Sequence, residues 1–107
     1  MPKQSAPQEL AQIAPKLVEV TNNVLFADIW ERPGLSPRDR SLVTVSVLAA
    51  LYRSEQLGYH LGVALENGLS VEELSEAITH LAFYAGWPNA MTAINQLKKI
   101  VDERTAD

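Results

Sequence analysis

The segment from Leu42 to Tyr52 constrains the fold of this chain more than any other. Apart from one threonine and one serine its residues are apolar, so apolar side chains would cover almost the whole circumference of a helix formed there. Ser36, Pro37 and Asp39, just before it, favour a helix start, because serine caps the first turn, proline fits the first helical position and aspartate suits the positive end of the dipole. The sequence predicts a helix that begins at Pro37 and is buried on all sides.

A second helix is predicted directly after it. Ser54 is a suitable N-cap, and the residues that follow place Leu57, His60, Leu61 and Ala64 at three- and four-residue spacing on one helix face. His60 is therefore expected to point inward.

The segments on either side also favour helices. Between residues 8 and 30 apolar residues recur close to the helical period, and Pro15 either begins a new helix or kinks this one, because it lacks a backbone donor. The run Trp-Glu-Arg-Pro-Gly at residues 30–34 is typical of a turn, with Arg32 moved out of the helical region by the proline after it. The helix after Ser54 is expected to end at Gly68, since glycine adopts the left-handed cap readily.

Two more helices are predicted toward the C-terminus. Ser70 and Glu73 form a capping box for the first of them, which Gly86 ends. The second runs through Val101 and ends in a charged tail at residues 102–107. Because no segment shows sustained two-residue alternation between hairpin turns, the chain is predicted to be all-α, a five- to six-helix bundle.

Length and composition limit the classes of function. The 107 residues suit one domain, at 7–107, after a flexible tail at 1–6. A net charge of −4 without a run of basic residues argues against binding nucleic acid or an anionic membrane. The longest apolar run is about half of the roughly 20 residues that a membrane span needs, and the N-terminus has no apolar leader, so a cytoplasmic protein is expected.

Three segments, WERPGLSPRDRSL, LYRSEQLGYH and HLAFYAGWPNAM, occur in this order, and with them the chain resembles the carboxymuconolactone decarboxylase family over roughly residues 17–103. The resemblance implies an all-helical fold of the alkyl hydroperoxide reductase D-like type. It also implies a homo-oligomer, commonly a hexamer or trimer, with active sites near subunit contacts.

The family contains two chemistries. The reductase branch uses a glutamate, a C-x-x-C pair and a histidine; with His60 as that histidine, Ser41 stands in place of the glutamate and Arg53 and Gln56 in place of the cysteines. A chain without cysteine cannot run a dithiol cycle, so thiol peroxidase activity is disfavoured. The other branch removes CO₂ from γ-carboxymuconolactone without a cofactor, and its E-x-L-x-x-H pattern matches Glu55 to His60.

The resemblance and the chemistry together define the candidate catalytic residues. His60 would stabilise charge or deliver a proton, which imidazole does well near neutral pH; the alternative is a core histidine bound to a backbone carbonyl. Arg40 would bind a substrate carboxylate through two parallel hydrogen bonds, or else pair with Asp39 or Glu31.

The candidate substrate-binding residues are Ser41, Arg53, Gln56 and Trp87. Arg53 could instead only interact favourably with the dipole at the C-terminal end of the preceding helix. Trp87, like Trp30 and Tyr84, could pack in a core or interface rather than form an apolar wall around substrate. His80 is expected to be structural or interfacial.

The sequence predicts neither a metal site nor a cofactor, because the two histidines lie on separate helices without ligand spacing. The leading hypothesis is a cofactor-free decarboxylase acting on a small carboxylated lactone or similar cyclic acid, in a homo-oligomer. The alternative is a non-catalytic ligand-binding or assembly protein that kept the fold.

Overall fold

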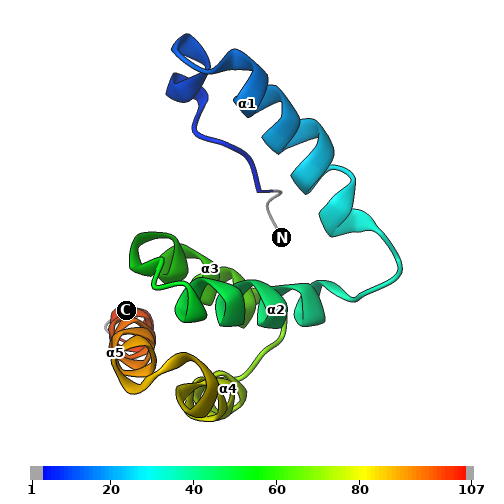
Figure 1. Ribbon diagram of the computed structural model, residues 1–107. Coiled ribbons are helices and arrows are strands. Elements are labelled where there is room, and N and C mark those ends of the chain that lie inside the picture. The colour runs from blue at the N-terminus through cyan, green and yellow to red at the C-terminus, as the bar shows by residue number, and fades with distance from the viewer. Residues whose placement is uncertain (1–3, 106–107) are drawn as a thin grey trace. The chain divides into compact units, whose positions relative to one another are not determined.

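Every regular element in residues 4–105, the part of the chain that the computed structural model describes, is a helix (Figure 1). The α-helices are α1 (Pro15–Val20), α2 (Pro37–Ala50), α3 (Ser54–Glu66), α4 (Val71–Ala85) and α5 (Trp87–Thr105). Two 3₁₀ helices, η1 (Gln8–Gln12) and η3 (Ile29–Glu31), and a π-helix, η2 (Thr21–Phe26), complete the set. The all-α prediction is confirmed.

Backbone contacts divide the chain into two compact units, one ending at Pro37 and the other beginning at Arg38. The first three residues of the predicted tail and the last two residues of the chain lie outside the described range. The single domain at 7–107 stays a prediction.

The first unit is built on α1 and η2. Pro15 occupies the first turn of α1, where its missing N–H breaks no helical bond, so it begins a helix rather than kinking one. Near the start of the chain, the Ala6 N–H donates to Asn22 Oδ1 at 2.8 Å. Arg32 has the extended conformation expected before Pro33, with φ −68° and ψ 140°.

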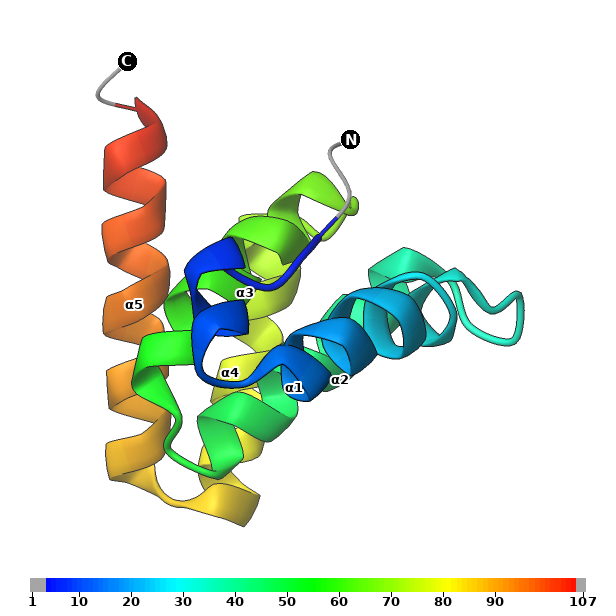
Figure 2. The same cartoon turned by 90° about the horizontal axis from the view of Figure 1, so that it is seen from above.

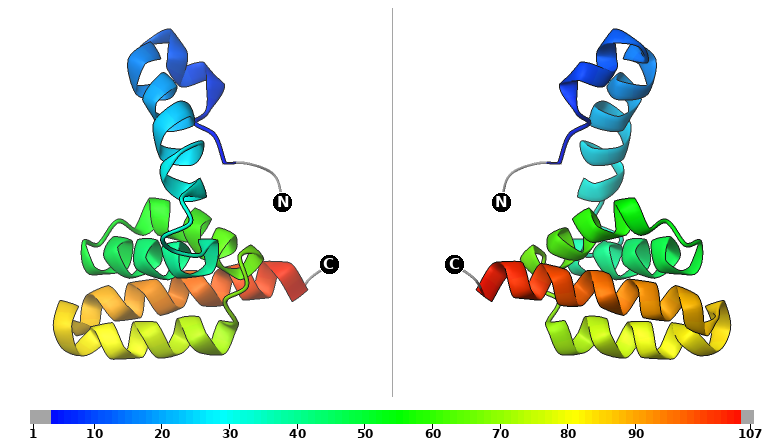
Figure 3. Two further views of the ribbon diagram at one scale, coloured as in Figure 1. Left: turned by 90° about the vertical axis from the view of Figure 1, so that its right-hand side faces the viewer. Right: turned by 90° about the vertical axis from the view of Figure 1, so that its left-hand side faces the viewer.

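The second unit holds the main hydrophobic core. Its α4 and α5 form an antiparallel hairpin, with α5 seen along its length in Figure 2, and α2 and α3 cover one side of that pair (Figure 3). The largest fully buried apolar side chains of the core are Leu57, Leu61 and Leu74. Val45 and Ala49 join α2 to the same core.

The helix ends of this unit follow local chemistry. The capping box of α4 is present, with Glu73 N–H donating to Ser70 Oγ and Ser70 N–H to Glu73 Oε1, each at 3.0 Å. Gly86 ends α4 at φ +107°. The predicted charged tail is helical as far as Thr105, and the exposed Lys98–Asp102 ion pair at 2.6 Å lies in the last turns of α5.

Ser54 is not the N-cap that the sequence predicted; Arg53 is. The cause is the end of α2, a Schellman motif in which Arg53 N–H donates to Leu48 O at 2.8 Å and Tyr52 N–H to Ala49 O at 3.1 Å. This motif places Tyr52 in the left-handed region, at φ +61°. The next helix therefore begins one residue earlier than the cap prediction required.

α3 ends in the same Schellman motif, and here the left-handed position is occupied by glycine, the residue most often found there. Leu69 N–H donates to Ala64 O at 3.0 Å, Gly68 N–H donates to Leu65 O at 3.2 Å, and Gly68 has φ +105°. A side chain in the left-handed region clashes with the backbone, and glycine avoids that cost. Tyr52 thus carries strain that Gly68 does not.

Replacing Tyr52 by glycine should stabilise the fold. Relief of the left-handed strain is expected to raise the free energy of unfolding by about 0.5–1 kcal/mol, measured by urea denaturation. Gly68→Ala is the matched reverse change: its Cβ would meet no atom within 4 Å, so the destabilisation expected there comes from the backbone alone. A Tyr52→Gly variant less stable than the wild type would contradict this account.

The central helix α2 is buried on one side. Ser41, Val45 and Ala49 face the core, whereas Val43 and Leu51 are 54% and 55% exposed. Val47 lies between them on the same outer stripe. The sequence predicted burial on all sides of this helix, but within the described chain only part of its circumference is buried.

None of the helices in residues 4–105 combines the length and the apolar character that crossing a membrane requires.

Candidate functional site

Three of the predicted site residues lie at the start of α3 or along it. Gln56 and His60 are four residues apart, so the helix brings them to one face, and Arg53 is the N-cap before the first turn. Arg53 and Gln56 are exposed, and Arg53 Nη1 donates to Leu51 O at 3.3 Å, while His60 is half-buried. The start of α3 therefore has an exposed cation at its cap and a partly buried imidazole two turns later.

His60 has the most unusual surroundings of the predicted residues. Its Nδ1 atom is buried and has no hydrogen-bond partner within residues 4–105, and its ring lies edge-on to Tyr59 with centroids 5.0 Å apart. Burial lowers the pKa of His60 below its ordinary value of 6.5, because the charged imidazolium loses hydration. The Nδ1 atom thus lacks the backbone carbonyl that a purely structural core histidine was expected to have.

The predicted residues on α2 differ from each other. Ser41 is 1% exposed, and its Oγ accepts a hydrogen bond from Asn67 Nδ2 at 2.9 Å, which joins α2 to the C-terminal end of α3. Arg40 is half-buried, and its carbonyl accepts a hydrogen bond from the Thr44 hydroxyl. Ser41 therefore makes a structural contact between α2 and α3, and its role in substrate binding stays a prediction.

Trp87 stands at the first position of α5 and is 57% exposed, with its ring edge-on to Phe83 at 5.3 Å. Two residues later, Asn89 Nδ2 donates to Ala50 O at 2.8 Å. This bond ties the start of α5 to the end of α2, beside the turn that carries Arg53. Trp30 belongs to the other compact unit.

The structure also reveals a groove between α2 and α4 that sequence analysis missed. It encloses about 670 Å³, within the range of small-molecule sites. Polar side chains on its lining include Arg38, Glu73, Glu76 and His80, and none of the predicted site residues contributes to it. The spacing of Glu76, His80 and Tyr84, four residues apart, indicates that they share one helix face. Only the position of α2 beside α4 shows that this face lines a groove.

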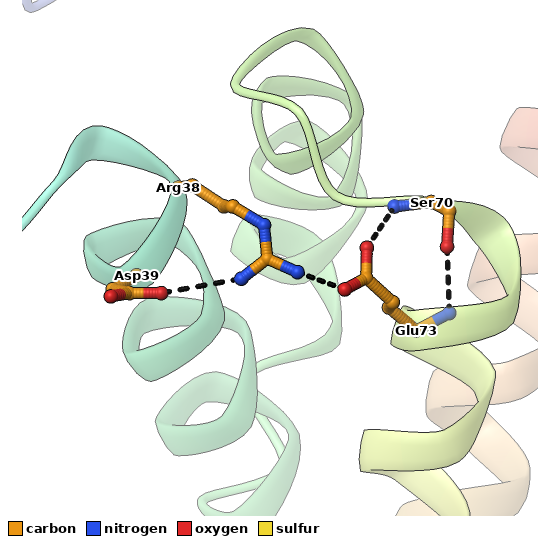
Figure 4. Close-up of polar contacts among 4 residues, drawn as sticks. All are labelled: Arg38, Asp39, Ser70 and Glu73. Carbon is orange, nitrogen blue, oxygen red and sulfur yellow. Dashed lines mark hydrogen bonds and ion pairs between the residues drawn. The ribbon is translucent and has the colours of Figure 1, made fainter.

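One end of the groove is organised by Arg38, which lies between two carboxylates (Figure 4). Its Nη1 donates to Asp39 Oδ1 at 3.3 Å and its Nη2 to Glu73 Oε2. Glu73 is the capping-box residue bound to Ser70. The same carboxylate therefore caps α4 and holds the first turn of α2.

No group of three or more histidine, cysteine or acidic side chains in residues 4–105 is arranged to hold a metal ion. The predicted site residues at the start of α3 and along it are a guanidinium, an amide and an imidazole. Such groups are suited to binding an organic anion and moving a proton.

The chain matches the model of the carboxymuconolactone decarboxylase family over residues 15–99. It is 40% identical over 75 residues to the 4-carboxymuconolactone decarboxylase of Acinetobacter baylyi, covering 70% of this chain and 56% of that protein. It is also 31% identical over 85 residues to a nitrosuccinic acid decarboxylase of Metarhizium robertsii, covering 79% of this chain and 59% of that one. The protein belongs to the carboxymuconolactone decarboxylase family, as its motifs indicated, and spans less than two thirds of the length of these two relatives.

The burial of His60 should make folding stability depend on pH. In the unfolded chain the imidazole takes up a proton near pH 6.5, whereas in the folded chain it does so only at lower pH. Protonation therefore favours unfolding, and the free energy of unfolding should fall as the pH drops below about 6.5. His60→Gln, neutral throughout, should weaken this dependence between pH 7 and 5 in urea denaturation.

His80→Gln makes the same substitution at an exposed position of α4 and controls for the loss of a histidine as such. If His60→Gln kept the full pH dependence of the wild type, the burial of His60 could not be its cause.

Proposed function

We propose that this protein is a cofactor-free decarboxylase of a small carboxylated lactone or similar cyclic acid. Two curated relatives are named as decarboxylases, one of 4-carboxymuconolactone and one of nitrosuccinic acid. The observation that carries the proposal to this chain is the half-buried His60, whose Nδ1 has no partner among the described residues. The proposal places the protein in the cytoplasm.

The chemistry requires two functions from the protein. When the bond between the substrate carbon and its carboxylate breaks, CO₂ leaves and the electron pair of that bond stays on the substrate, where an adjacent carbonyl delocalises it. A proton then adds to the carbon that lost the carboxylate. In the proposal His60 stabilises the charge and donates this proton, and burial, which lowers the pKa of His60, makes its imidazolium a stronger acid. Arg40 binds a carboxylate of the substrate.

The remaining predicted residues would surround the substrate. Gln56 shares the helix face of His60, and Arg53 caps the same helix. Trp87 begins the helix that is tied to the neighbouring turn. Ser41 would contribute from α2, next to Arg40. Arg53 adds a second positive charge on this side, which favours an anionic ligand.

The second candidate is a non-catalytic protein that binds a ligand or another protein. One observation favours it: the Ser41 hydroxyl, at the position where the reductase branch has its catalytic glutamate, is buried and bound to Asn67. A residue fixed in this way supports the fold without any turnover.

Activity on 4-carboxymuconolactone tests the enzymatic proposal directly. His60→Gln should reduce the rate of CO₂ release at least 100-fold, since general acid–base catalysis typically contributes 10²–10⁴-fold, while helical circular dichroism and molecular mass stay unchanged. His80→Gln is the control and should keep the wild-type rate. Undiminished activity in His60→Gln would exclude His60 as the proton donor, and a wild-type protein inactive on carboxylated lactones would favour the binding alternative.

We further propose that the protein is a homo-oligomer, a hexamer or trimer, in which another copy covers the outer stripe of α2. The support is the exposure of Val43, Val47 and Leu51, which together make an apolar strip along the helix. Closed symmetry would bury this strip in every subunit.

Light scattering at micromolar concentration should therefore give the mass of an oligomer, and the melting temperature should rise with protein concentration. Val47→Asp should shift the mass toward the monomer, because a charge in an apolar interface lacks a partner. Val71→Asp makes the same change at an exposed valine on the first turn of α4 and should leave the mass unchanged. A monomeric wild type with a concentration-independent melting temperature would contradict the assembly.

A further inference from the structure

We propose that the groove between α2 and α4 binds a small organic cation, an amine or amidine with a flat apolar body. This ligand would be additional to the carboxylated substrate and would bind on a different side of α2. The inference depends on the charges and aromatic rings that line the groove, and it goes beyond the proposed decarboxylation.

The groove and the His60 site use different sides of α2. Residues 38, 42 and 46, four apart, line the groove. Arg40 comes two residues after Arg38, which turns its side chain by about 200° around the helix. The cation assigned to the acid substrate therefore points away from the groove.

The uncompensated charge in the groove is negative. Arg38 is ion-paired with both Asp39 and Glu73, so its positive charge is already balanced. Glu76, by contrast, has no ion pair or hydrogen bond to any residue in the described range and is exposed. An organic cation would gain a favourable interaction there, whereas a carboxylate would be repelled.

The same helix face offers flat surfaces beside this charge. The rings of His80 and Tyr84 lie 5.1 Å apart, inclined by 36°, and Tyr84 is 82% exposed. Glu76 and Tyr84 are eight residues apart, about 12 Å along the axis. One cationic group therefore cannot contact both, and a ligand with its charge at Glu76 would extend a ring over His80 toward Tyr84.

The floor of the groove is apolar. Leu42 comes from α2, Leu81 from α4, and Leu69 from the segment between α3 and α4. Leu69 and Leu81 belong to the buried core, so the floor is rigid, which suits a preformed site. A benzene ring fits this combination of apolar floor and aromatic wall.

Benzamidine and benzoate provide a matched test, since they have similar shapes and opposite charges. Titration of ¹⁵N-labelled protein should show benzamidine shifting the amide resonances of the groove segments of α2 and α4, and benzoate leaving these resonances in place. Glu76→Gln should weaken benzamidine binding about three- to fivefold, the usual effect of an exposed ion pair. Tyr84→Ala should weaken it by a similar factor through the lost ring contact.

Glu103→Gln is the control, because it removes one exposed carboxylate from α5, outside the groove, and should keep the wild-type affinity. Benzoate binding in the groove as tightly as benzamidine would overturn the proposal and make the groove an anion site. Benzamidine binding that is absent, or unaffected by Glu76→Gln, would also overturn it. Because binding is measured without turnover, neither result depends on the outcome of the decarboxylation assay.

Discussion

The attachment of α2 to the other three helices of its unit is the interaction on which the rest of this structure depends. Its apolar face contributes Val45 and Ala49 to the core, but polar contacts fix where the helix ends lie. Arg38 joins the first turn of α2 to α4, and Ser41 joins α2 to the end of α3. Ala50 O, at the other end of α2, accepts a hydrogen bond from the Asn89 side chain of α5. Burial supplies most of the favourable free energy, whereas these directional bonds determine the position of α2.

Local chemistry was readable in the sequence, and chemistry created by packing was not. Gly68 and the Ser70–Glu73 box were predicted correctly because each depends on residues three to five positions apart. Tyr52 was missed, since its left-handed conformation follows from the way α2 ends rather than from its own preference. His80 was expected to be structural or interfacial, and only the structure shows that it lines a groove together with Arg38, from a distant segment.

The candidate site was predictable in part for the same reason. Helical spacing groups His60 with Gln56, and that grouping holds in the structure because both lie on one regular helix. Spacing could not reveal that Ser41 is bound to Asn67, which is 26 residues away, nor that His60 Nδ1 has no partner in the described part of the chain. The roles of the individual residues in catalysis stay predictions.

The short turn at residues 51–53 has a consequence for how this protein can vary. The N–H groups of all three turn residues donate to carbonyls in the last turn of α2, and Arg53 is at the same time the N-cap of α3. One inserted residue would break the backbone bonds of this motif and change the direction in which α3, and His60 with it, leaves α2. The turn therefore sets the angular register of the two helices, and insertions and deletions should be far less tolerated there than substitutions.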